Sequence, residues 1–206
     1  MLDLISVVLH LDQYLTSIIK DYGILVYLLL FLIIFLETGL VVMPFLPGDS
    51  LIFVAGALAA AGILNFALLL ALFAIAAIAG DTMNYWIGHH FNRQVLAKGK
   101  IKFVKKEHLV KAYKFYEKHG GKTIIIARFL PFIRTFAPFI AGVIRMRYKK
   151  FISYNVIGGV TWVAAFLAAG YYFGNIPAVK NNLGLIVIGI VVVTAVAGLA
   201  GFLRHN

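Results

Sequence analysis

Long apolar runs, each with few polar interruptions, dominate the pattern along the chain. The longest cover residues 24–43, 66–80 and 183–203. A helix needs about 20 mainly apolar residues to cross the hydrocarbon core of a bilayer, so these runs approach spanning length. The pattern predicts an all-α polytopic membrane protein. The composition agrees, since 62% of the 206 residues are hydrophobic and only 13% are charged.

Four spanning helices are expected, together with one helix that lies along the membrane surface. The expected spans cover residues 23–43, 64–88, 151–174 and 183–203. Residues 3–20 carry apolar side chains at helical spacing, which is typical of an amphipathic helix at the membrane interface. The first span can also be read as one arm of a hairpin, and the two readings put the N-terminus on opposite sides of the membrane.

The stretch from residue 121 to 142 does not fit an ordinary spanning helix. It is strongly apolar, yet it contains Arg128 and Arg134 and is interrupted by Pro131 and Pro138. An arginine at bilayer depth costs roughly 2.5–3.5 kcal/mol on insertion scales, so it normally faces a protected cavity and marks function. Proline removes a helical hydrogen bond, and the freed backbone is tolerated only where protein or a watery cavity covers it. A broken hairpin is therefore predicted.

Basic residues on both sides of this stretch predict that it enters and leaves the membrane on one face. Ten lysines and arginines lie within residues 93–122, and four more follow the hairpin: Arg145, Arg147, Lys149 and Lys150. Basic loops are retained in the cytoplasm. A re-entrant hairpin keeps both clusters there, whereas a span would put one of them outside.

A similar window lies in the first half of the chain. Pro44, Pro47 and Gly48 precede Asp49, and the apolar segment 51–61 follows. The likeness of the two windows predicts an inverted repeat with two facing, proline-broken re-entrant hairpins, as in transporters whose broken segments meet near the midplane.

The whole chain, residues 1–206, is predicted to be a single membrane domain. Its expected parts are repeat 1 (about 3–90), a basic cytoplasmic linker with an amphipathic helix (about 91–120), repeat 2 (about 105–174) and a final span (about 183–203).

Two acids and two arginines at the predicted membrane depth form a neutral set: Glu37, Asp49, Arg128 and Arg134. Paired charges that face a cavity are tolerated in a membrane, whereas a lone charge is costly. The fixed fork of an arginine suits a phosphate or a carboxylate, and a carboxylate removed from water binds a proton more readily. The set can therefore hold an anionic headgroup while an acid exchanges a proton, or it can simply join the hairpins by ion pairs. Asp81 has a similar choice between a packing role near Asn84 and a proton path.

Other chemistries find little support. The chain has no cysteine, which excludes disulfides and thiolate sites. His89 and His90 have no partner at metal-ligand spacing, and Ser50, Thr135 and Ser153 have no His/Asp arrangement for nucleophilic catalysis. The net charge of +11 is concentrated beside membrane segments, where topology and anionic lipids explain it better than nucleic acid does. We expect no enzymatic activity, metal, cofactor or nucleic-acid partner.

The polar motifs resemble those of the DedA family, whose core is also called the VTT or SNARE-associated domain. The resemblance extends from about residue 20 to 200. It rests on three motifs: Glu37-Thr38-Gly39 followed by Pro44-Phe45-Leu46-Pro47-Gly48-Asp49; Gly80-Asp81 followed by Tyr85 and Gly88; and Arg128-Phe129 followed by Pro131, Arg134 and Ala141-Gly142.

The resemblance implies a multi-pass protein of the bacterial cytoplasmic (inner) membrane with two facing re-entrant hairpins. It implies that Glu37, Asp49, Arg128 and Arg134 are required for function. It also implies a role in envelope maintenance that depends on the proton-motive force. For several family members it implies the return of undecaprenyl phosphate across the membrane.

The first functional hypothesis is a translocase of a lipid phosphate such as undecaprenyl phosphate. Arg128 and Arg134 would bind the headgroup, while Glu37, Asp49 and Asp81 would couple protons or pair with the arginines. The alternatives are a proton-coupled exporter of small cations or drugs, a membrane lipid phosphatase, and a scaffold without transport. Membrane lipids and protons are the expected partners, and a homo-oligomer is left open.

Overall fold

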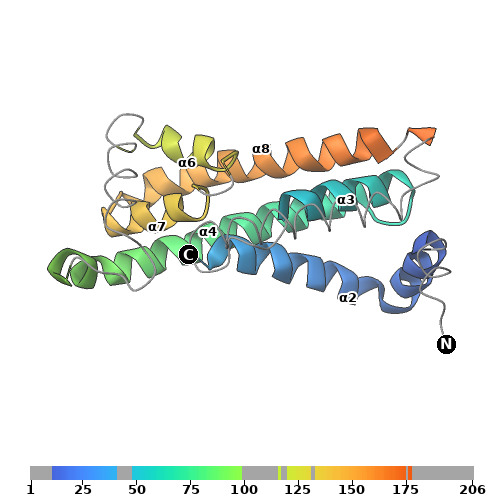
Figure 1. Ribbon diagram of the computed structural model, residues 1–206, viewed down its shortest axis with the longest axis horizontal. Helices are drawn as coiled ribbons and strands as arrows, with labels where there is room; N and C mark the ends of the chain where they lie inside the picture. The colour runs from blue at the N-terminus through green and yellow to red at the C-terminus, as the bar shows by residue number, and fades with distance from the viewer. Residues whose placement is uncertain are drawn as a thin grey trace, which may run out of the picture. The chain divides into compact units, whose positions relative to one another are not determined.

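All the regular structure in the described part of the chain is α-helical (Figure 1). The computed structural model describes residues 11–40, 48–98, 116, 120–130, 133–174 and 176–177, with the backbone alone for 11–22 and 91–98. The helices are α2 (Leu11–Gly39), α3 (Gly48–Ala60), α4 (Phe66–Lys98), α6 (Lys122–Ala127), α7 (Phe136–Val143) and α8 (Tyr148–Gly174). The predicted all-α class is therefore confirmed for these residues.

Two of the helices are long and apolar enough to cross a membrane. They are Phe66–His90 within α4, with a mean hydropathy of 2.1, and Tyr148–Gly174, with 1.6. Both coincide with predicted spans. The helix α4 continues to Lys98, so the first part of the predicted linker is helical. The rest of that linker, apart from Tyr116, and the predicted span at 183–203 lie outside the described residues.

The helix α2 is continuous where the sequence pattern predicted two elements. The expected boundary between an interfacial helix and a span lies near residues 20–23, yet α2 runs from Leu11 to Gly39. A single glycine lowers helix stability by only about 1 kcal/mol, and no proline is present there to stop the helix. The helix ends at Gly39, while residues 1–10 and the end of the predicted span at 41–43 lie outside the described part.

The chain divides into two compact units, and each is described by itself. The first comprises residues 1–31, 45–73 and 163–206, and the second comprises residues 32–44 and 74–162. In the first unit, α3 crosses the C-terminal part of α8 at two glycines. A Cβ at Gly56 would meet the carbonyl oxygen of Leu167, and a Cβ at Gly170 would meet that of Phe53. The two backbones are in direct contact, so the crossing requires glycine.

The second unit contains a crossing of the same form between α7 and α4. A Cβ at Gly142 would meet the carbonyl oxygen of Tyr85, and a Cβ at Gly88 would meet that of Phe139. In both units a phenylalanine and a glycine three residues later, on a short helix, face a glycine on a long helix. The two crossings thus have the same local form, and the inverted repeat that the sequence suggested stays a prediction.

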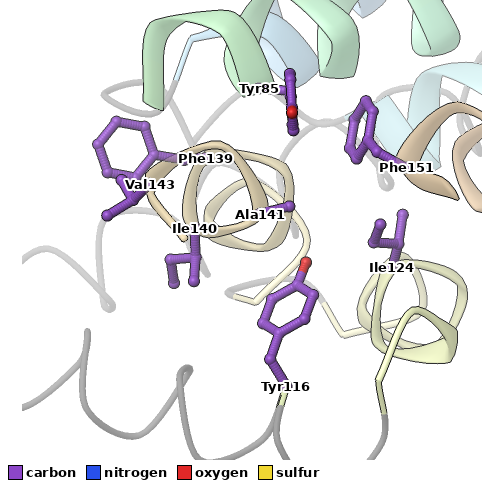
Figure 2. Packing of buried hydrophobic residues seen from close by; sticks show 8 residues of the cluster. All are labelled: Tyr85, Tyr116, Ile124, Phe139, Ile140, Ala141, Val143 and Phe151. Atoms are coloured by element: carbon purple, nitrogen blue, oxygen red, sulfur yellow. The ribbon is translucent and has the colours of Figure 1, made fainter. Parts of the chain in front are cut away.

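Buried side chains surround α7 in the second unit (Figure 2). Tyr85 of α4 stacks on Phe151 of α8, with ring centroids 4.5 Å apart. In the same view Ile124 of α6 lies below Phe151, and Tyr116 lies below α7. This packing holds α6 and α7 against α4 and α8.

Candidate functional site

The predicted hairpin at 121–142 is broken in the structure, between α6 and α7. The two short helices contact each other, and the described backbone between them forms tight turns. Leu130 N donates to Ala127 O at 3.0 Å, and Phe136 N donates to Ile133 O at 3.1 Å. Pro138 lies in the first turn of α7, where its missing N–H leaves no helical hydrogen bond unmade. It therefore lies within a regular helix, and the break precedes it.

Side chains from outside the hairpin satisfy carbonyl groups next to the break. Asn84 Nδ2 donates to Thr135 O at 2.7 Å and to Thr38 O, near the end of α2, at 3.3 Å. The Tyr116 hydroxyl donates to Ala137 O at 2.6 Å. A hydrogen bond of this kind contributes about 0.5–1.5 kcal/mol, so these bonds stabilise the backbone around the break. They also join α2, α4 and the hairpin at one level.

Arg128, which follows α6, is buried and held by two helices. Its Nη2 donates to Asp81 Oδ2 of α4 at 2.5 Å and to Asn155 Oδ1 of α8 at 2.6 Å. Asn155 in turn donates to Ile78 O at 3.0 Å, which fixes the orientation of its amide. The side chains of Arg128 and Asp81 are only 4% and 5% exposed. The guanidinium is therefore fixed by hydrogen bonds on two sides.

Arg134, which precedes α7, forms an ion pair with Glu37 of α2. The Glu37 side chain has no exposed surface, and that of Arg134 is nearly buried. Two arginines on either side of the break thus each meet one buried acid from a different helix. The total formal charge of these four groups is zero, as buried charges in a membrane require.

Both arginines also lie over the same aromatic ring. The Cζ atoms of Arg128 and Arg134 are 5.8 Å and 5.3 Å from the centroid of Trp162, on α8. These distances fall within the range of cation–π interactions. Trp162 is itself fully buried.

A small cavity lies at the meeting point of these groups. It has a volume of about 10 Å³ and is lined by Thr38, Asp81, Arg128, Arg134, Thr135 and Trp162. A space of this size accommodates about one water molecule. The buried hydroxyl of Thr135 has no hydrogen-bond partner in the described part of the protein. The space is therefore polar, lined by charged groups, and too small for a phosphate group.

The structure brings four of the predicted site residues together in the second unit: Glu37, Asp81, Arg128 and Arg134. Asp81 pairs with Arg128, and the choice between a packing role and a proton path stays open. Asp49 lies in the first turn of α3, in the first unit, and is partly buried.

The predicted hairpin breakers are only partly described. Gly48 is the first residue of α3, while Pro44, Pro47 and Pro131 lie outside the described residues. Among the residues that the structure does describe, no group of three or more histidines, cysteines and acids could hold a metal ion.

Trp162, Asn155 and Thr135 are the site residues that the sequence reasoning missed. In the sequence, Thr135 stands out only as a candidate nucleophile. Asn155 gave a usable signal, because an amide inside a spanning helix needs a partner. Trp162 gave none, because an aromatic residue in an apolar run is normally a packing residue.

Comparisons with known proteins are consistent with these observations. Residues 46–172 match the family model of the VTT domain. The chain is 52% identical to Protein DedA of Escherichia coli (strain K12) over 205 residues, which cover 98% of this chain and 94% of that protein. It is 41% identical over 167 residues to an uncharacterized membrane protein of Mycobacterium leprae, covering 81% and 75%. It is 34% identical over 157 residues to the inner membrane protein YghB of Escherichia coli (strain K12), covering 76% and 72%. No solved structure matches the chain.

Proposed function

This chain belongs to the DedA family of membrane proteins, and from that premise we propose that it is a transporter of a lipid phosphate. The proposed substrate is undecaprenyl phosphate, as the family resemblance implies. The proposed location is the bacterial cytoplasmic membrane, since a relative is named an inner membrane protein. The two broken segments are re-entrant hairpins of an inverted repeat in this proposal, and the protein is not an enzyme.

The observation that carries the proposal is the pair of buried arginines beside one cavity. Each guanidinium presents a planar fork that suits a phosphate, and both lie over the ring of Trp162. One phosphate group can therefore bind both arginines. In the structure, Asp81 and Glu37 each form an ion pair with one of the arginines. Their carboxylate oxygens therefore lie where the phosphate oxygens would bind.

Charge balance links this exchange to protons. The two arginines and two acids are neutral together, and a phosphate monoester brings about −1.5 to −2 charges near pH 7. When the phosphate replaces the carboxylates, the site becomes neutral again if the displaced acids bind protons. Release of these protons on one side of the membrane would couple transport to the proton-motive force. Asp49 is proposed to act with Glu37 in this coupling.

The test is the movement of labelled undecaprenyl phosphate between the leaflets of proteoliposomes, with and without a pH gradient. We expect movement that requires the protein and responds to the gradient. Arg128→Lys keeps the charge and loses the fork. Hydrogen bonds to charged groups contribute about 1.5–3 kcal/mol, so the rate should fall by about 10–100-fold. The exposed residue Lys149 provides the matched control, because Lys149→Arg is an equally conservative change outside the site.

Other outcomes would favour the alternatives. Folded wild-type protein that moves no lipid phosphate would contradict the proposal, and proton-coupled export of cations would then be measured in the same vesicles. Release of inorganic phosphate from the labelled lipid would instead indicate a phosphatase.

A further inference from the structure

One face of α8 forms a cradle for Arg128. Asn155, Gly158, Gly159 and Trp162 follow one another at intervals of three, one and three residues. Residues spaced by three, four and seven share one face of a helix. Asn155 and Trp162 contact the side chain of Arg128. A Cβ atom added at either glycine would lie close to the same side chain.

The two glycines leave room for the arginine. A Cβ at Gly158 would lie 3.2 Å from Cδ of Arg128, and a Cβ at Gly159 would lie 3.4 Å from Nη2. The first distance is shorter than an ordinary van der Waals contact, and the second is at the lower limit of that range. Asn155 accepts a hydrogen bond from Nη2 at one end of this space, and the indole of Trp162 closes the other end.

Trp162 also serves the second arginine. Two guanidiniums near the same ring repel each other, and this repulsion is strong where water is excluded. The negative face of an indole attracts a cation more strongly than other aromatic rings do. A ring that is 1% exposed and contacted by both cations therefore offsets part of their repulsion. It can do so whether or not the carboxylates are in place.

We propose that Trp162 is a positioning residue that holds Arg128 and Arg134 side by side as a single phosphate-binding site. The position of the Arg128 side chain beside this ring is held by three other residues of α8: Asn155, Gly158 and Gly159. This inference rests on the proposed function, because the phosphate is the headgroup of that proposal. When the carboxylates leave, the ring keeps the two guanidiniums together, and a preorganised pair binds the phosphate more tightly than a mobile one.

The chain allows a clean test of the ring, because it contains only two tryptophans. Trp86 is 44% exposed and outside the site, so Trp86→Phe leaves Trp162 as the sole tryptophan. Biosynthetic replacement by mono-, di- and trifluorotryptophan then weakens the electrostatic attraction of the ring stepwise and barely changes its shape. The probe is farnesyl phosphate in detergent micelles, with farnesol as the control that lacks the phosphate. Thermal unfolding is recorded for each protein.

We expect the Kd for farnesyl phosphate to rise with each added fluorine, by about tenfold over the series, with no change for farnesol. Trp162→Phe, which keeps a weaker ring, should fall within the series. Farnesyl phosphate binding that does not change across the series would overturn the role of Trp162 and leave the proposed function standing. Fluorination that lowers the unfolding temperature and leaves the Kd unchanged would also overturn this role, because Trp162 would then serve only in packing. Wild-type protein that binds the phosphate no better than the alcohol would overturn both proposals.

Discussion

The ion pair between Arg128 and Asp81 contributes little net stability for the desolvation that it requires. Both side chains are almost completely removed from water, and the desolvation of a buried pair offsets most of its Coulombic attraction. Apolar residues of similar size would often serve stability equally well. The pair is therefore better explained by a requirement for charge at this position than by a requirement for stability.

A comparison of one single variant with one double variant separates these two explanations. Asp81→Leu leaves the guanidinium buried without its acid, and we expect a loss of about 3–5 kcal/mol in unfolding free energy. Arg128→Met combined with Asp81→Leu removes both charges and should restore most of that stability. Neither protein should transport. The measurements are denaturant unfolding in micelles and the proteoliposome assay, and transport by the double variant would show that the pair is only structural.

Arg145 provides a second prediction, because it has a backbone conformation that favours glycine. Its φ angle is 54°, and it ends α7 in a motif in which Met146 N donates to Ala141 O at 2.9 Å. The same motif ends α3, where the corresponding residue is Gly62 with φ 78°. The left-handed conformation costs other residues about 1–2 kcal/mol. Arg145→Gly should therefore raise the unfolding free energy by about 1 kcal/mol.

The comparison is Gly62→Ala, which should lower the unfolding free energy by a similar amount because it introduces the same strain. Both variants are measured by denaturant unfolding in micelles. A loss of stability in Arg145→Gly would show that the arginine side chain makes contacts that outweigh the strain.

The sequence indicated the charged residues of the site better than their partners. Glu37, Arg128 and Arg134 could be singled out because charges are rare at membrane depth. The pairing of Arg128 with Asp81 could not be predicted, since it depends on how the hairpin and α4 cross. The role of Trp162 could not be predicted for a related reason. A cation–π contact depends on where the ring and the cation lie in space, and the sequence shows only that an aromatic residue is present.

At the scale of elements, the prolines predicted part of the local structure, whereas the glycines at the helix crossings did not. Two prolines and two arginines were enough to predict a break in the segment that forms α6 and α7. They did not place its ends, because Pro138 fits the first turn of a helix. The glycines at the helix crossings could be read only from the structure, since their requirement comes from the neighbouring backbone.

The crossing of α4 and α7 gives a prediction for these glycines. A Cβ at Gly142 would meet the backbone oxygen of Tyr85 and lie 2.7 Å from the backbone nitrogen of His89. Backbone atoms cannot move aside as a flexible side chain can, so Gly142→Ala should destabilise the protein by about 1–3 kcal/mol or more. Gly56→Ala should have a similar effect in the first unit, because its Cβ would meet the oxygen of Leu167.

Gly23, on α2, is the matched control. Nothing lies within 4 Å of a Cβ at this position, and alanine favours a helix by about 1 kcal/mol over glycine. Gly23→Ala should therefore be neutral or stabilising in the same unfolding measurement. Equal losses in all three variants would show that the effect is not specific to the crossings.

At the scale of the whole molecule, the compact units interleave along the chain. Each unit takes residues from both halves of the sequence, because α3 packs on α8 and α7 packs on α4. The repeats were predicted as consecutive segments, and the sequence gives no sign that each short helix packs on the long helix of the other half. The two units share the form of their glycine crossings, and the inverted repeat itself stays a prediction.

The short helices also bear on how the hairpin enters the membrane. The helix α6 has six residues and α7 has eight. At 1.5 Å per residue they are about 9 Å and 12 Å long, so neither alone spans a hydrocarbon core of about 30 Å. Since they also contact each other, the segment fits a hairpin that returns to the side from which it came.

Single cysteines test this topology directly, because the chain contains no cysteine of its own. Lys122 lies at the start of the hairpin and Lys149 follows it, and both are exposed. Ala61 lies beyond the other end of the α4 span. An impermeant maleimide should label Ala61→Cys in intact spheroplasts, and it should label Lys122→Cys and Lys149→Cys only after permeabilisation.

Labelling at positions 122 and 149 distinguishes a re-entrant from a spanning segment, because the two topologies predict different results for this pair. A re-entrant hairpin puts both on the same side, and the basic residues around them make that side the cytoplasm. A spanning segment would put one of them outside, where the reagent reaches it without permeabilisation. That result would contradict re-entry and also the inverted repeat. Labelling of both from outside would keep the hairpin and reverse the proposed orientation of the protein.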